Sequence, residues 1–376
     1  MARLNFYNAF TVGRASRVFW TLDIGYTCAD VWSQSNRRKS TRSTHYPATV
    51  PPVAYEGLTP TMTTSTMNSA TLLDGREFSP NPISPDLLDN SPSADSIREE
   101  AREASEKTPH AETTTGRLLR YKADRRSVTM VSLMFGAHAA VFFLAPMWLA
   151  VLFVIPLAVG SMFVAAINHH HQHFNTFHSS LINRVYDIAL SLQTGIAPFA
   201  WVLHHNLGHH LNYLHQRPHA EADESRWTRE DGSQMGRVEY TIDLLMHHQF
   251  DIIRVGRRYP KYLRAFLWMK LPLWAVLGLA LYWNPANAVL VILLPGFITL
   301  AHTSWVTYGH HAGLRTTDHY EASMNCVNPL FNYLSCNLGY HTAHHKRPGV
   351  HWSQLPKLHE EIKHRIPPEL IDTEFF

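Results

Sequence analysis

Two long uncharged stretches dominate the pattern of apolar and polar positions along this 376-residue chain. Residues 127–167 and 271–309 contain no Asp, Glu, Lys or Arg over 41 and 39 positions. Because a helix crosses a bilayer core with about 20 residues, each stretch is long enough for two spans joined by a turn. Pro146 with Met147 marks the first turn, and Trp283–Asn287 (WNPAN) marks the second. The pattern predicts an all-α membrane protein with about four transmembrane helices in two hairpins, rather than a buried hairpin of a soluble protein.

Charge predicts the orientation of the hairpins. Basic stretches at Arg117–Arg126 and Arg254–Arg264 precede them, whereas neither hairpin turn is charged. Since positive flanks stay in the cytoplasm, both turns should face the other side and every long loop should be cytosolic. The second basic stretch could also bind the phosphate of an acyl carrier or a free carboxylate. Lys270 should lie at the edge of its span, where its side chain can reach the interface.

Residues 1–116 differ in kind from residues 117–376. Ser, Thr and Pro make up 32 of the 77 residues from Ser40 to Gly116, and apolar periodicity is missing. Such a segment buries too little apolar surface to offset its chain entropy, so we expect a disordered extension. A start codon assigned too early, with Met62 or Met67 as the true beginning, is favoured over a transit peptide.

Composition excludes some classes of protein. A net charge of +3, without a basic run interleaved with aromatic residues, argues against a nucleic-acid partner. Cys28, Cys326 and Cys336 are too widely spaced for a CxxC pair or a disulfide framework, which fits a reducing compartment. Between the hairpins, Ile188–Leu203 is apolar but short and contains Gly195 and a proline, so we expect an interfacial or re-entrant segment.

Histidine changes the picture most, because 19 of the 26 histidines lie in two windows, residues 168–220 and 302–351. Three clusters stand out: NHHHQHFNTFH at Asn168–His178, HHNLGHH at His204–His210 and GYHTAHH at Gly339–His345. In each cluster, histidines three or four residues apart would share one face of a helix. These histidines are His169 and His173; His205, His209 and His210; and His341, His344 and His345.

Imidazoles crowded in this way favour a bound metal, because protonated rings would repel whereas neutral imidazole is a metal ligand. Eight histidines are too many for one tetrahedral zinc and about right for two metals of higher coordination. Asp187 is the only acid from Asn168 to Ala220, which argues against Mg²⁺, Ca²⁺ and the glutamate base of HExxH peptidases. A histidine-bound pair of irons fits best, with O₂ binding and attack on an unactivated C–H bond as its natural chemistry.

A ninth ligand is expected after the last span, in YGHHAGL at Tyr308–Leu314. His310 and His311 both lie where the span leaves the bilayer, and His302 could line the substrate path. The remaining histidines have other expected positions: His138 pairs across helices within its span, His170, His171, His178 and His204 lie beside the ligands or at the surface, and His247 and His248 lie in a loop.

An HxxxH, an HxxxHH and an HxxHH box, separated by two uncharged hairpins, resemble the integral-membrane fatty acid desaturase and hydroxylase superfamily. The resemblance covers roughly Arg117–Phe376. The second box, HNLGHH, and HHAGL after the last span are most similar to the alkane-hydroxylase branch, which carries HxxGHH and EHYGL. By that analogy His311 is the ninth ligand, and His310 stands where that branch has a glutamate.

The resemblance implies a membrane di-iron enzyme that uses O₂ and two electrons to oxidise a long acyl or alkyl chain. Neither an HPGG haem-binding stretch nor a rubredoxin-like cysteine pair occurs, so a ferredoxin, rubredoxin or haem-cytochrome donor and its reductase should be separate proteins. The boxes should lie in a helical cap on the cytosolic side. The implied iron ligands are His169, His173, His205, His209, His210, His311, His341, His344 and His345.

Desaturation of a fatty acyl chain is the expected reaction. Alkyl hydroxylation, or decarboxylation to a terminal alkene and CO₂, would use the same centre with a different substrate pose. A membrane metal carrier is an alternative from another class, but carriers usually place ligands within spans or in flexible tails. A zinc-dependent membrane hydrolase is disfavoured by the ligand count and by the lack of a glutamate base.

Overall fold

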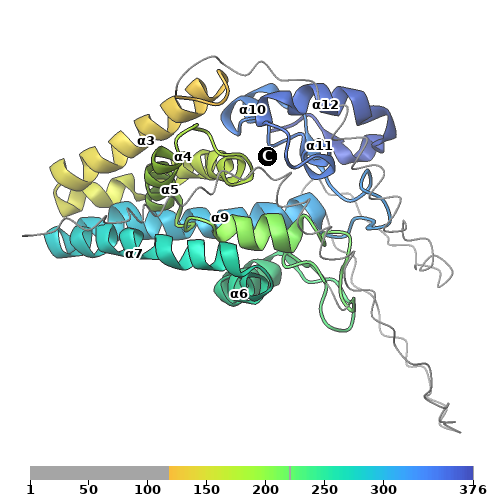
Figure 1. Ribbon diagram of the computed structural model, residues 1–376, viewed down its shortest axis with the longest axis horizontal. Helices are drawn as coiled ribbons and strands as arrows, with labels where there is room; N and C mark the ends of the chain where they lie inside the picture. Colours follow the sequence, from red (N-terminus) through yellow and green to blue (C-terminus); the bar gives the residue numbers. More distant parts are fainter. Residues whose placement is uncertain (1–117, 220–221, 376) are drawn as a thin grey trace, which may run out of the picture. The chain divides into compact units, whose positions relative to one another are not determined.

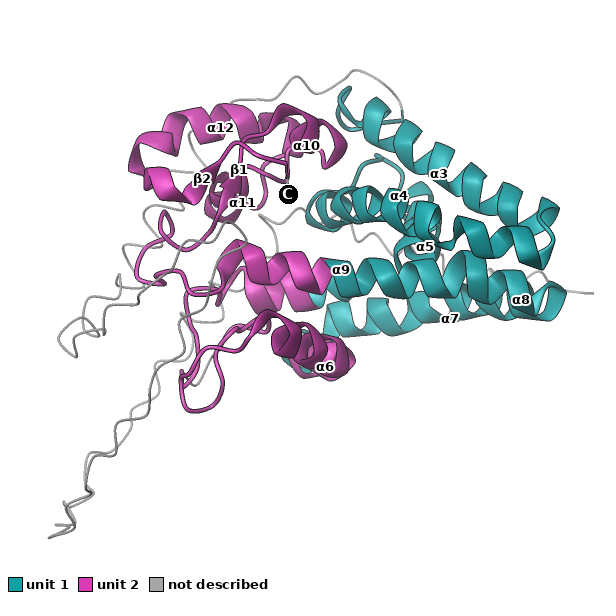
Figure 2. Cartoon of the chain, turned by 180° about the vertical axis from the view of Figure 1, so that it is seen from behind, with its two compact units in different colours: residues 1–27, 112–203, 256–302 teal, residues 28–111, 204–255, 303–376 magenta. Residues whose placement is uncertain are grey.

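The computed structural model describes residues 118–219 and 222–375, so the predicted extension over residues 1–116 lies outside the described residues. The described chain is mostly helical (Figure 1), with strand confined to two segments of two residues each. These residues form two compact units (Figure 2): unit 1 comprises residues 118–203 and 256–302, and unit 2 comprises residues 204–255 and 303–375.

Four helical stretches are long and apolar enough to cross a membrane, as the sequence predicts. The first hairpin turns at Pro146, where the chain adopts an extended conformation before the next helix. The second turns at Asn284, whose side chain accepts a hydrogen bond from the Asn287 backbone N–H. The spans are α3 (Asp124–Leu144), α4 (Met147–His173), α7 (Pro260–Trp283) and a final stretch made of α8 (Pro285–Asn287), η3 (Ala288–Leu293) and α9 (Leu294–His311).

The turns of the two hairpins lie together at one end of unit 1. The side-chain amide of Asn287 donates to the carbonyl oxygens of Phe142 and Ala145, at 2.9 and 2.8 Å. Buried side chains around this point, including Ala150 and Val291, form a small apolar core. Both uncharged turns therefore lie at the same end of the spans, as expected if each hairpin enters and leaves the membrane on the same side.

Helix α4 is the most enclosed span, with half of its apolar window buried, against 17% for α7. It packs against α3, α5 (Ser180–Thr194) and η3. The Ile188–Leu203 segment starts within α5, which ends at Gly195, and continues through buried Ile196 and Phe199 into η2 (Val202–His209). The first and second histidine clusters are thereby joined through one packed helix and a short connection.

Unit 2 is built from α6 (Arg237–Arg258), the end of α9 and the C-terminal elements. Its two strands pair in parallel, with Asn325 opposite Ile371 and Cys326 opposite Asp372. Tyr320, Ile366 and Leu370 form a small buried core beside them. The C-terminal elements are β1 (Asn325–Cys326), α10 (Pro329–Leu334), α11 (His341–Lys346), η4 (Trp352–Gln354), α12 (Leu355–Ile362), η5 (Lys363–Arg365), η6 (Pro368–Leu370) and β2 (Ile371–Asp372).

One sequence prediction needs correction. His247 and His248 do not lie in a loop; both belong to α6. His247 faces Asp243 one turn earlier, and His248 is buried with its ring 4.8 Å from that of His204. The prediction was wrong because it considered only ligand spacing, whereas α6 is amphipathic around a buried face. Lys270, predicted at the edge of its span, belongs to α7, and its ammonium group lies over the rings of Phe266 and Trp274.

Gly195 ends α5 with a φ of +71°, and its backbone lies against that of Gly296 at the start of α9. A Cβ at Gly195 would lie 2.7 Å from the Gly296 carbonyl oxygen. The left-handed conformation alone costs a residue with a Cβ about 1–2 kcal/mol. This contact therefore requires glycine at position 195.

We predict that Gly195→Ala lowers the apparent melting temperature of the detergent-solubilised protein by several degrees, since backbone atoms cannot move aside as a flexible side chain does. The matched control is Gly278→Ala in α7, where nothing lies within 4 Å of the added Cβ. The control should melt like the unmodified protein, measured by intrinsic fluorescence. Equal melting of both variants would contradict the close approach of the two backbones.

Candidate metal centre

The third histidine box lies on α11, and Asn325 of β1 positions it. The Asn325 side chain accepts a hydrogen bond from the Thr342 backbone N–H at 3.0 Å and donates to the Thr342 hydroxyl at 2.8 Å. Gly339 precedes the helix so closely that a Cβ there would lie 2.1 Å from the Cys326 carbonyl oxygen. His341, His344 and His345 are all buried as a result.

The second box lies at the end of η2, which is a π-helix. The His210 backbone N–H donates to the His205 carbonyl at 2.8 Å, which is an i to i+5 hydrogen bond. This wider turn brings the Nε2 atoms of His205 and His210 within 2.9 Å of one another. The rings of His205 and His209 still stack, with centroids 5.1 Å apart, as their spacing predicts, and the wider turn brings His210 in beside them.

The π-helix divides the second box between two groups of imidazoles in unit 2. His210 Nε2 lies 2.9 Å from His205 Nε2 and 3.0 Å from His344 Nε2. These three form the group that we call group A. One nitrogen of each of its rings lies within 4.8 Å of the others.

The second group, which we call group B, contains His209 with histidines from the last span and the third box. Nitrogens of His209, His311 and His345 lie within 4.8 Å of one another. His341 joins them, because its Nε2 lies 3.0 Å from His311 Nε2 and 3.2 Å from His345 Nε2. Seven of the nine predicted ligands are thus gathered within unit 2.

The first box lies in unit 1, in the last two turns of α4. His169 and His173 face the same way, with their Nε2 atoms 3.2 Å apart. The Gln172 side chain accepts from the backbone N–H groups of Trp201 and Val202 and donates to Asn168 at 2.9 Å. This network ties the first box to the start of η2 within the same unit.

Hydrogen bonds with neighbouring residues fix the proton of two imidazoles on Nδ1, so that Nε2 of each ring is a hydrogen-bond acceptor that faces the other histidines. His209 Nδ1 lies 2.9 Å from both carboxylate oxygens of Asp223, so it carries the proton. His209 Nε2 is then a lone-pair nitrogen, buried and without a hydrogen-bond partner among the described residues. His311 Nδ1 likewise donates to the Ala322 carbonyl at 2.9 Å, which leaves its Nε2 as an acceptor.

Hydrogen bonding cannot satisfy all of these contacts. His341 Nε2 faces both His311 Nε2 and His345 Nε2, and His210 Nε2 faces two nitrogens in group A. A neutral ring nitrogen carries one proton or one lone pair, so it cannot bond to two such partners. Cations between the nitrogens would resolve both clusters, so the residues present fit a metal centre.

The separations also bear on the coordination geometry. Two nitrogen ligands about 2.1 Å from a metal lie about 3.0 Å apart at right angles and about 3.4 Å apart at the tetrahedral angle. The five Nε2–Nε2 separations lie between 2.9 and 3.2 Å. Neighbouring nitrogens are therefore close enough to share a metal ion. Neither group contains a carboxylate or a cysteine among the residues described.

Burial favours the neutral form of two imidazoles of the third box, His341 and His345. Desolvation lowers the pKa of His341 and His345 well below the usual range, and the neighbouring histidines lower it further. The neutral form is the one that binds a metal. The site is thus poised to accept cations without first losing protons.

Asp223 is a functional residue that was not predicted from the sequence, because it lies just after the histidine-rich stretch Asn168–Ala220. Asp223 is buried, with an exposed fraction of 1%, and it also accepts from the Ser225 backbone N–H at 2.8 Å. The next residue, Glu224, is buried and forms an ion pair with the half-exposed Arg254. An acidic pair in HAEADESRW, shortly after the second box, was the available signal.

Other histidines take supporting positions. His171 Nδ1 lies 2.9 Å from the Thr176 hydroxyl, and its Nε2 lies 3.3 Å from Asp187, which also pairs with Arg184. The His138 ring lies 3.5 Å from the Ser161 hydroxyl across the first hairpin, as predicted. His310 stacks on His341 with ring centroids 4.2 Å apart, His170 and His204 are buried, and His178 is exposed.

Comparison with known proteins agrees with this description. The model of the fatty acid desaturase family matches residues 146–373, which is well over half of the chain. A comparison with curated proteins finds no match. The matched region includes all four histidine-bearing segments and three of the four spans. This chain belongs to the fatty acid desaturase family of di-iron oxidoreductases.

Proposed function

We propose that this protein is a membrane-bound di-iron desaturase that introduces a double bond into a long fatty acyl chain. Family membership supports oxidation of the desaturase or hydroxylase type. The observation that carries the proposal is the convergence of imidazole nitrogens, without carboxylates, in groups A and B. We further propose that His169 and His173 complete the centre, so that the nine predicted histidines hold two irons.

The overall reaction would join the removal of two hydrogens from adjacent methylenes to the reduction of O₂. One O₂, two electrons and two protons are consumed for each double bond, and two molecules of water are formed. Bound iron would supply the O₂ activation. Because the same centre can support other outcomes, the pose of the acyl chain would determine that an alkene forms.

The protein's own residues orient the ligands and exclude water. Asp223 holds the proton of His209 on Nδ1, and the Ala322 carbonyl does the same for His311. Such hydrogen bonds fix the orientation of a ligand ring and raise its basicity. His209 and His344, each with an exposed fraction of 1%, are shielded from solvent, which limits side reactions at the centre.

We also propose that the histidine boxes face the cytoplasm. The uncharged hairpin turns lie together at one end of unit 1, and the basic flanks lie at the opposite ends of α3 and α7. The positive-inside tendency then places the basic ends in the cytoplasm. Electrons would come from a separate ferredoxin, rubredoxin or haem-cytochrome donor and its reductase on that side.

The full chain, expressed with a donor and its reductase, should convert a saturated fatty acid deuterated along its chain into a product with an internal double bond. Mass spectrometry should show that two deuterium atoms are lost and that no carbon is lost. A product one carbon shorter would indicate decarboxylation, and an added oxygen would indicate hydroxylation. Metal binding without O₂ consumption would point instead to a metal carrier.

Replacing His209 with alanine should abolish turnover and lower the bound iron, because His209 lies in group B with an acceptor nitrogen facing the other imidazoles. Iron is measured by plasma emission spectrometry on anaerobically purified protein. His178→Ala is the control, since His178 is exposed. Full activity in His209→Ala would remove this residue from the ligand set.

Asp223→Asn should keep the shape of the side chain but remove the charge that orients His209. Loss of such a partner typically costs about 10- to 100-fold in metal affinity or activity. The measurement is the rate at which a chelator removes iron, compared with Asp231→Asn, a change at an exposed carboxylate. Equal rates in both variants would show that Asp223 does not support a ligand.

A further inference from the structure

Helix α6 carries two apolar faces. One is buried within unit 2, where Tyr240 and Leu244 pack with Met235, and Ile252 and Val255 continue the same side of the helix. This face accounts for the position of α6 in the fold. The opposite side of the helix takes no part in this packing.

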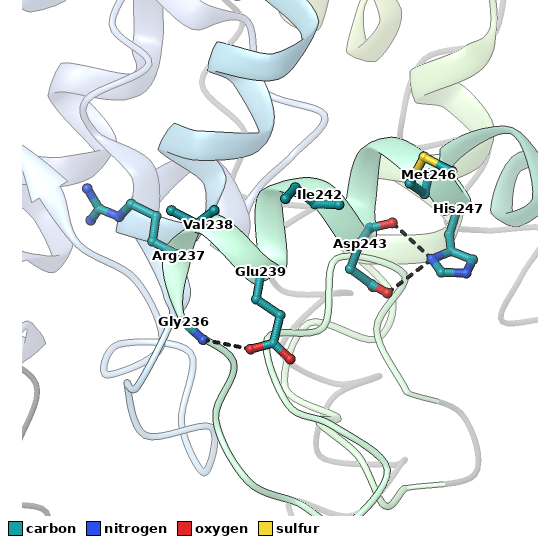
Figure 3. Close-up of a pocket in the computed structure, with 8 residues that line it drawn as sticks. All are labelled: Gly236, Arg237, Val238, Glu239, Ile242, Asp243, Met246 and His247. Atoms are coloured by element: carbon teal, nitrogen blue, oxygen red, sulfur yellow. Dashed lines mark hydrogen bonds and ion pairs between the residues drawn. The ribbon is translucent and has the colours of Figure 1, made fainter. Parts of the chain in front are cut away.

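The opposite face is a row of large apolar side chains in the open. Val238, Ile242, Met246 and Phe250 follow one another at intervals of four residues, with exposed fractions of 61, 56, 68 and 71%. Figure 3 shows the first three along the helix, while Glu239 and Asp243 point to another side. We call these four residues the α6 stripe.

A stripe of this kind differs from the usual exposed apolar residue. Single exposed apolar side chains are common in soluble proteins, but a contiguous row marks a surface that contacts something other than water. Most other large apolar side chains exposed to a similar degree among the described residues lie on the four spans. In this chain, lipid is therefore the usual surrounding of such side chains.

Connectivity and charge indicate what contacts the stripe. Helix α6 ends at Arg258 and the span α7 begins at Pro260, so a single residue separates the stripe's helix from a membrane crossing. The junction is basic, with Arg257 and Arg258 exposed at the end of α6. Lys261 and Arg264 continue the basic charge into the first turns of α7.

The acidic residues of α6 do not oppose this arrangement. Glu239 is bound by Arg229, and Asp243 faces His247 at 3.0 Å. Asp251 is buried and pairs with Arg254. The exposed C-terminal end of the helix is therefore positive, as expected of a helix that meets lipid phosphates.

We propose that the α6 stripe is an interfacial membrane-binding surface, inserted among lipid acyl chains while Arg257 and Arg258 contact anionic lipid headgroups. This surface is separate from the histidine groups and does not depend on the reaction that they support. It would hold unit 2 against the bilayer through a second attachment besides the spans.

The test is a site-directed spin-label scan of the full chain reconstituted in vesicles of phosphatidylcholine with phosphatidylglycerol. Single cysteines replace Ile242, Phe250, Asp243 and His247 in a Cys28→Ser background, since Cys326 and Cys336 are buried free thiols. Leu279→Cys on α7 is the lipid reference and Asp231→Cys the water reference. Collision rates with O₂, which concentrates in lipid, and with a water-soluble nickel chelate are measured for each label.

Labels at positions 242 and 250 should resemble the Leu279 reference, with an O₂-to-nickel ratio several-fold above that of the Asp243, His247 and Asp231 labels. A nickel accessibility equal to that of the water reference would overturn the proposal. Low accessibility to both reagents would also overturn it, because the stripe would then be covered by protein, such as a second copy of the chain.

A second measurement does not rely on cysteine labelling. Phe250 is replaced by benzoylphenylalanine, which is similar in shape, and the reconstituted protein is irradiated. Adducts with phospholipid, found by mass spectrometry and reduced in Arg257→Gln/Arg258→Gln, would support the proposal. Protein–protein adducts without lipid adducts would overturn it. The exposed position of Phe250 makes a loss of folding unexpected in this variant.

Discussion

Imidazole nitrogens of buried and half-buried histidines, 2.9–3.2 Å from one another, impose the constraint on which the rest of this structure depends. Neutral rings at these distances cannot all be donor and acceptor to each other, and protonated rings would repel. Burial removes the option of charge, since it lowers the pKa of His341 and His345. The arrangement is consistent only if cations take the positions between the nitrogens.

The surroundings of the histidines follow from that constraint. A ring that directs the lone pair of Nε2 toward a metal must carry its proton on Nδ1. Asp223 accepts a hydrogen bond from Nδ1 of His209, and the Ala322 carbonyl accepts one from Nδ1 of His311. The backbone must also be held, which Asn325 does for α11 and Gln172 does for the end of α4. These buried polar residues satisfy groups that the ligands or their helices would otherwise leave unpaired.

The spans have a different task and a different construction. Only 17–50% of each apolar window is buried inside the protein, so at least half of each window is available to lipid. Their internal contacts are few and specific, such as the Asn287 amide between the two turns and the Gly195–Gly296 backbone contact. In a bilayer, stability comes from such close contacts, because apolar burial between helices gains little over burial in lipid.

The sequence by itself determined the four spans, the hairpin turns and the identity of the clustered histidines. Each of these depends on local composition or short spacing. The thickness of a bilayer explains the length of the uncharged stretches, and the ligand chemistry of imidazole explains the spacing of the histidines. Tertiary structure alone decided how the histidines are divided. The π-helix sends His205 and His210 to one group and His209 to the other, a division that the spacing of the histidines does not predict. Asp223 and Asn325 reach their partners through folding of the chain between distant positions, and no local pattern records such contacts.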